Sequence, residues 1–177
     1  MIAVYILAGI VLLLLLLFLL APSRYDVSRS VTVRRDPQSV YEYLRFLKNQ
    51  DHWSPWGKKD PNMKKEFRGT DGTVGATSIW DGNKEVGAGE QEILSLDPGR
   101  RIDSELRFLK PWKSTSQAYL EVEPEGDDAT RVRWGFTGRN GFPMRIMMLF
   151  MSMDKMVGKD FETGLANLKE LLEADAG

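Results

Sequence analysis

The N-terminal segment, residues 1–21, constrains the chain more than any other feature of the sequence. It carries no charged side chain, and every residue in it except Gly9 is apolar or aromatic. As a helix rising about 1.5 Å per residue, the segment spans about 30 Å, which is the thickness of the hydrocarbon core of a bilayer. A run such as Leu12–Leu20 leaves no polar face for a water-soluble helix. We therefore predict a transmembrane anchor over residues 1–21.

A cleaved signal peptide is the alternative interpretation of this segment. No Lys or Arg precedes the apolar run, the run is long, and Pro22 directly follows the small residue Ala21. These flanks favour an uncleaved anchor. The basic residues Arg24, Arg29, Arg34 and Arg35 all follow the helix. The positive-inside rule therefore places the C-terminal domain in the cytoplasm as part of a single-pass protein.

Composition excludes several classes of function for the remaining domain, residues 22–177. The chain has 24 Lys+Arg against 25 Asp+Glu, one His and no Cys. This balance gives no basic surface for nucleic acid. The lack of Cys excludes disulfides, thiolate catalysis, zinc fingers and iron–sulfur ligation, and a single His is too few for most transition-metal sites. We expect no metal, no cofactor and no nucleic-acid partner.

The domain has the pattern of an α+β protein. Asp36-Pro37 is a typical helix start, and a second short helix or turn is expected over Asn49–Trp53. Alternating apolar and polar residues, separated by turn residues, predict antiparallel strands with one apolar face. The predicted strands cover residues 25–33, 64–69, 75–80, 85–96, 101–108, 114–123 and 130–137. The alternation shifts after Ile93, which indicates a bulge.

A long helix is predicted from about Pro143 to about Glu173. Its apolar stripe repeats every three or four residues and comprises Met147, Phe150, Met153, Val157, Phe161, Leu165, Leu168 and Leu172. A helix of about 45 Å crosses the whole sheet. We expect the space between this helix and the apolar face of a curved sheet to be the functional site.

Several stretches of the sequence carry a family resemblance. They are "YDVSRSVTV" (25–33), "WSPW" (53–56), "DP" (60–61), "GTVGATSIWDGNKEVGAGEQEI" (72–93), "LRFLKPW" (106–112), "RVRWGFTG" (131–138) and "MDKMVGKDFETGLANLKELLE" (153–173). In this order they resemble the helix-grip fold of the START-like (SRPBCC) superfamily, in particular its polyketide cyclase/dehydrase and lipid-transport branch.

The resemblance implies a curved antiparallel sheet of about seven strands wrapped around a long C-terminal helix. It also implies a deep hydrophobic cavity for lipids, polyketides, sterol-like molecules or quinones. Members with an N-terminal transmembrane helix form a bacterial variety, so the implied location is the bacterial cytoplasmic (inner) membrane. Only some branches catalyse a reaction, and no catalytic set of the family maps onto this sequence.

Aromatic and aliphatic side chains on the predicted inner surfaces are the candidate ligand-binding residues. They are Trp53, Trp56, Trp80, Leu106, Phe108, Leu120, Trp134, Phe136, Met147 and Met151. For Trp134, ordinary core packing is favoured over cavity lining, and for Trp53 and Trp56 the two roles are balanced. The segment 141–151 is apolar nearly all round, which suggests that it gates the cavity and contacts the bilayer surface.

Candidate catalytic groups are few. Glu90 and Glu92 share one strand face and are candidate cavity acids with raised pKa if that face points inward, although such pairs more often face water. His52 has no neighbouring nucleophile and is expected to have a surface or packing role. We assign no catalytic residue and expect a membrane-anchored carrier or sensor of a hydrophobic small molecule or lipid.

Two alternatives to a binding protein remain. A polyketide cyclase/aromatase-type enzyme would use the same cavity and needs a buried titratable group in it. A ligand-free interaction module at the membrane would fill the cavity with its own Trp, Phe and Met side chains.

Overall fold

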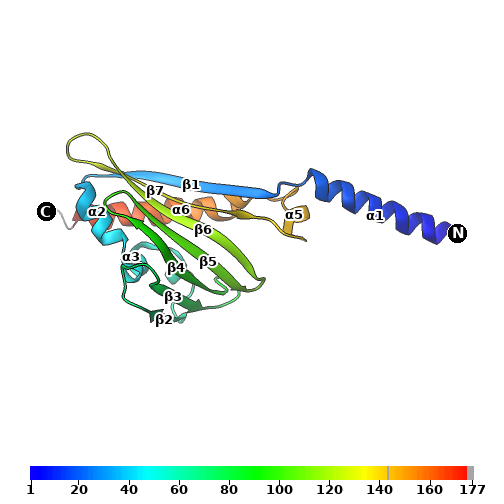
Figure 1. Ribbon diagram of the computed structural model, residues 1–177, viewed down its shortest axis with the longest axis horizontal. Coiled ribbons are helices and arrows are strands. Elements are labelled where there is room, and N and C mark those ends of the chain that lie inside the picture. The colour runs from blue at the N-terminus through cyan, green and yellow to red at the C-terminus, as the bar shows by residue number, and fades with distance from the viewer. Residues whose placement is uncertain (143, 175–177) are drawn as a thin grey trace.

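The computed structural model describes residues 1–142 and 144–174, and it consists of one projecting helix and an α+β domain (Figure 1). Helix α1 (Ile2–Leu20) projects from one end of the domain, and most of its apolar side chains are exposed. Its length and apolar composition are sufficient to cross a membrane. The predicted helical form of the N-terminal segment is therefore confirmed.

A single seven-stranded antiparallel sheet forms the frame of the domain. Its spatial order is β1-β7-β6-β5-β4-β3-β2. The strands are β1 (Arg24–Val33), β2 (Lys64–Arg68), β3 (Thr77–Asp81), β4 (Ala88–Asp97), β5 (Arg101–Lys110), β6 (Ser114–Pro124) and β7 (Thr130–Arg139). The predicted α+β class, strand number and antiparallel pairing are confirmed. The β4–β5 register shifts between Ile93 and Ser95, which is the expected bulge.

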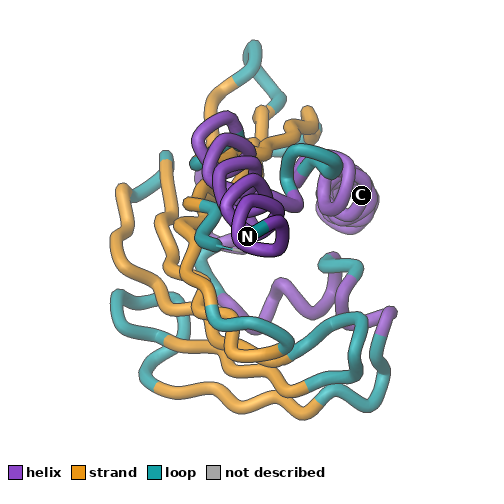
Figure 2. Tube along the Cα trace, turned by 90° about the vertical axis from the view of Figure 1, so that its right-hand side faces the viewer, coloured by secondary structure: helices purple, strands orange, loops and turns teal. Residues whose placement is uncertain are grey.

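Strand β4 begins three residues later than predicted, at Ala88. Residues 82–87 form a turn instead, because the Gly82 amide donates to the Gly87 carbonyl and Gly87 has a positive φ of 72°. The resulting strands curve around the helices, as the end-on view in Figure 2 shows.

Short helices follow β1 and cover one part of the inner face. Helix α2 (Pro37–Leu44) starts as predicted, with the Asp36 carboxylate accepting a hydrogen bond from the Ser39 amide at 2.8 Å. A 3-10 turn, η1 (Leu47–Asn49), leads into α3 (Gln50–Trp53), which confirms the expected second helix. Helix α4 (Trp56–Lys59) was not predicted; its single turn begins directly after Pro55.

The predicted C-terminal helix is in fact two helices. Helix α5 (Met144–Met147) is followed by a turn, and α6 (Met153–Ala174) is the long helix; the predicted start at Pro143 lies outside the described residues. The break lets the first part pack back on α1. Arg145 Nε donates to the Ala21 carbonyl at 3.0 Å, which satisfies a carbonyl that the end of α1 leaves without a helical partner.

Helix α6 closes the core against the sheet. Its buried apolar stripe contains Phe161, Leu165, Leu168 and Leu172, as predicted. Gly164 brings the helix so close to the sheet that an added Cβ would lie 2.8 Å from the Trp134 ring. The inner sheet face therefore packs directly on α6 at this level.

Candidate functional site

An apolar cavity lies between the inner face of the sheet and helices α3, α4 and α6. Its volume is about 340 Å³, within the range of roughly 300–1,000 Å³ that small-molecule sites occupy. Its walls include the predicted residues Trp56, Trp80, Leu106, Phe108, Trp134 and Phe136. The protein's own aromatic side chains therefore leave this space open, unlike the filled cavity expected of a ligand-free interaction module.

Ring contacts make one wall of the cavity rigid. Trp134 stacks on Phe161 with ring centroids 4.2 Å apart and an angle of 12° between the planes. Trp56 meets the same Trp134 ring edge-on at 5.4 Å. Across the cavity, Trp80 and Phe108 form a second edge-on pair with centroids 6.0 Å apart. Trp134 thus belongs to the core and lines the cavity at the same time.

Four predicted lining residues do not line this cavity. Trp53 is fully buried behind Trp134, with their rings 4.8 Å apart, and Leu120 is buried in the main core. Met147, the last residue of α5, and Met151, in the turn that follows α5, are partly exposed. Their displacement follows from the break between the two helices, which carries this segment away from the sheet.

Glu90 and Glu92 lie on the outer face of β4 and are not cavity acids. Arg107 pairs with both, at 2.5 and 2.6 Å, and with Glu105 at 2.8 Å. These hydrogen bonds to three carboxylates raise the pKa of Arg107. Side chains alternate along a strand, so Gln91, between the two glutamates, points into the cavity.

Gln91 and Ser78 are polar residues of the cavity that sequence reasoning missed. They lie opposite each other in the β3–β4 register. Within the described part of the chain, neither side chain has a hydrogen-bond partner. The bulge near Ile93 obscured the facing of β4 in the sequence, although the alternation with Glu90 and Glu92 was the available signal. The two side chains offer a ligand donors and acceptors in an otherwise apolar wall.

The ionisable lining residues lie at the rim of the cavity. Lys65 pairs with Asp51, and Lys110 pairs with Asp81 at 2.9 Å. Each ionisable residue of the described lining is exposed. His52 lies outside the lining and shares a hydrogen bond of 2.9 Å between Nδ1 and the Tyr43 hydroxyl. The described lining therefore contains no buried acid or base for cyclase-type proton transfer.

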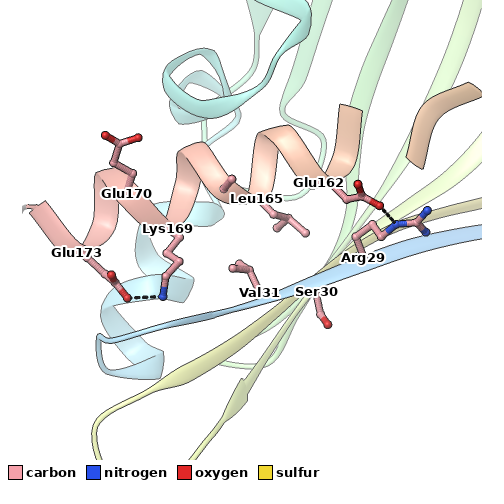
Figure 3. Close-up of a pocket in the computed structure, with 9 residues that line it drawn as sticks. Arg29, Ser30, Val31, Glu162, Leu165, Lys169, Glu170 and Glu173 are labelled. Carbon is pink, nitrogen blue, oxygen red and sulfur yellow. Dashed lines mark hydrogen bonds and ion pairs between the residues drawn. The ribbon is translucent and has the colours of Figure 1, made fainter. Parts of the chain in front are cut away.

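A second hollow follows the edge of the sheet between β1 and α6, and it is charged and open (Figure 3). Its volume is about 460 Å³, and ion pairs border it. Arg29 bonds to Glu162 at 2.7 Å, and Lys169 bonds to Glu173 at 2.7 Å. In each pair the two opposite charges are already bonded to each other and are not available to a ligand. The apolar cavity is therefore the stronger candidate site. Among the described residues, no group of three or more His, Asp or Glu side chains is placed to hold a metal ion.

A seven-stranded antiparallel sheet that holds a long C-terminal helix over an apolar cavity defines a helix-grip domain. The family model described as "Polyketide cyclase / dehydrase and lipid transport" matches residues 24–173. The chain belongs to this family, and the predicted resemblance is confirmed. No curated protein matches the sequence.

Solved structures share the fold at low sequence identity. A protein from Thermobifida fusca has a TM-score of 0.61 and 21% identity, over 83% of this chain and 92% of that one. A protein from Nitrosospira multiformis has a TM-score of 0.59 and 18% identity, over 86% and 99% of the two chains. The Aha1 dimer from Colwellia psychrerythraea has a TM-score of 0.56 and 18% identity, also over 86% and 99%.

Proposed function

We propose that this protein is a membrane-anchored carrier or sensor that binds a hydrophobic small molecule or lipid in the cavity between sheet and α6. The observation that carries the proposal is the open cavity with aromatic walls. Burial of apolar ligand surface there contributes about 25 cal/mol per Å² removed from water. The family to which the chain belongs is consistent with a ligand of this class.

The ligand of this proposal has an apolar body and at least one polar group. Trp80, Phe108 and Trp134 contact the apolar part, while Ser78 and Gln91 hydrogen-bond the polar group. Long-chain fatty acids, phospholipids and quinones have this character. A buried polar group without a partner loses affinity, so the Ser78–Gln91 pair selects against pure hydrocarbons.

In the same proposal, α1 is an uncleaved anchor in the bacterial cytoplasmic membrane and the domain faces the cytoplasm. The apolar helix supports the span, and Arg24, Arg29, Arg34 and Arg35 on its C-terminal side support the orientation. Tethering keeps the cavity close to membrane-soluble ligands and raises their effective concentration.

The test is a binding titration of the full chain in detergent micelles with oleic acid, a phospholipid and a quinone. Trp56, Trp80 and Trp134 line the cavity, so intrinsic tryptophan fluorescence reports occupancy. Ala118 also lines the cavity on β6, and Ala118→Phe fills part of it. Thr115→Phe adds the same ring to the opposite, exposed face of that strand and is the matched control.

We expect saturable binding of at least one probe to the wild type and to Thr115→Phe, and a loss of that binding in Ala118→Phe. Circular dichroism of each variant establishes that the fold is retained. Equal binding by all three proteins would contradict the location of the site. No saturable binding of any probe by the wild type would contradict the ligand class.

A further inference from the structure

The segment that joins β7 to α6 packs against the last turn of α1. The rings of Phe142 and Phe18 lie 6.5 Å apart, and the Arg145 guanidinium lies 4.3 Å from the centre of the Phe18 ring. Phe18 belongs to the apolar helix itself. When α1 spans a bilayer, these contacts hold residues 142 and 144–151 at the boundary between hydrocarbon and headgroups.

Exposed apolar side chains gather at this end of the domain. Phe142 is 73% exposed and Phe150 is 80% exposed. Trp112, in the turn between β5 and β6, is 65% exposed. The strand register brings this turn to the same end, because β6 begins beside the last residues of β7 (Figure 1). Outside α1, the large exposed apolar residues of the described chain lie at this end, apart from Val74 and Leu94.

Unpaired basic groups accompany these apolar side chains. Arg24 and Arg139 are direct neighbours in the β1–β7 register, and both are exposed. Like charges in directly opposite positions repel, so this arrangement favours a bound anion. Lys113 adjoins Trp112 in the β5–β6 turn. In the part of the chain that the structure describes, none of these three basic groups forms an ion pair.

The cavity reaches the same end of the domain. Lys110 and Pro111 of the β5–β6 turn line it, and so does Val157 in the first part of α6. Aromatic side chains with neighbouring basic groups are typical of proteins that lie in the interface of anionic membranes.

We propose that the α1 end of the domain is a docking surface for an anionic lipid bilayer. The docking surface comprises residues 142 and 144–151 and the β5–β6 turn with Trp112. It places the end of the cavity against the membrane, so that ligand is exchanged with the bilayer. This inference rests on the proposed anchoring by α1 and adds a second, independent contact with the lipid.

The experiment uses the full chain in vesicles of phosphatidylcholine and phosphatidylglycerol. The natural sequence has no Cys, so a single introduced Cys carries an environment-sensitive fluorophore at one defined position. Phe150→Cys and Trp112→Cys report on the docking surface, and Leu13→Cys reports on the anchor. Val74→Cys is the matched control, because Val74 is 60% exposed in the loop between β2 and β3, which joins the end of β3 remote from the β5–β6 turn. Nitroxide-labelled lipid quenches only the labels that contact the bilayer.

We expect quenching at positions 13, 112 and 150 and none at position 74. Replacing Arg139 with Gln is expected to weaken the docked state about fivefold, the contribution of one basic side chain near an anionic surface. Quenching at 112 or 150 no stronger than at 74, with position 13 quenched, would overturn the docking surface and leave the anchor intact. No quenching at position 13 would overturn the anchor and the inference that rests on it.

Discussion

Trp134 of β7 and Phe161 of α6 are stacked face to face, with ring centroids 4.2 Å apart and planes inclined by 12°. The pair joins the helix to the sheet and forms one wall of the cavity. Phe161 is only 3% exposed. The stability of the domain and the shape of its cavity therefore depend on the same contact.

Truncation of Phe161 tests this contact. Phe161→Ala is expected to lower the free energy of unfolding by roughly 3–5 kcal/mol, because the change removes a buried ring and leaves a void. Phe161→Leu keeps most of the volume and costs clearly less. Urea unfolding of the full chain in micelles, followed by circular dichroism, measures the loss of unfolding free energy in each variant. Equal losses for the two variants would show that the stack does not hold α6 in place.

Two glycines of α6 give opposite predictions for the same substitution. Alanine is about 1 kcal/mol better than glycine inside a helix. At Gly164 the new Cβ would lie 2.8 Å from Trp134 and 3.2 Å from Pro55, both in packed surroundings. At Gly158 the nearest group is the end of the long Arg29 side chain, at 2.4 Å. Its exposed ion pairs with Asp154 and Glu162 contribute little stability, so this side chain can move aside. We expect Gly164→Ala to destabilise the domain and Gly158→Ala to leave its melting temperature unchanged or higher.

Comparison of the two variants also defines the outcome that would contradict this account. If Gly164→Ala were as stable as Gly158→Ala, the close approach of α6 to the sheet at Trp134 would be wrong.

Glu173 makes the stability of the α6 C-terminus dependent on pH. Hydrogen bonds from Lys169 and from the Arg34 amide lower the pKa of Glu173 from 4.5 to about 2. A lowered pKa in the folded state stabilises the fold above pH 4.5, and this contribution disappears as the pH falls towards 2. Glu173→Gln is therefore expected to melt below the wild type at pH 7 and together with it near pH 2. A gap in melting temperature that stays constant over this range would contradict the assigned ionisation.

Gln91 is expected to distinguish ligands with a polar group from those without one. Gln91→Leu removes a hydrogen-bonding group from the cavity wall and leaves the volume similar. Loss of one hydrogen bond corresponds to about 1 kcal/mol, or about fivefold in affinity. We expect this loss for oleic acid and no loss for its hydrocarbon analogue in the tryptophan fluorescence titration. An equal effect on both probes would place the polar group of the ligand elsewhere.

Much of the fold was predictable because it depends on local pattern. The alternation along β5, β6 and β7 correctly assigned Leu106, Phe136 and their neighbours to the inner face. Asp36-Pro37 correctly marked the start of α2, since a cap needs only nearby residues.

The remaining features depend on contacts between distant segments. The segment 141–151 is apolar nearly all round, so periodicity alone did not reveal the break between α5 and α6. That break is accompanied by the contact of Arg145 with the end of α1. Likewise, the sequence left open whether Glu90 and Glu92 face inward, because only strand pairing determines which side of β4 faces the cavity, and that side carries Gln91.

Native mass spectrometry of the full chain, purified from bacterial membranes in a mild detergent, is the most direct measurement. We predict a co-purified species of defined mass that has an apolar body and a polar group. The species should be absent from Ala118→Phe and present in Thr115→Phe. An empty wild-type protein that also takes up no fatty acid, phospholipid or quinone would contradict a ligand-binding function.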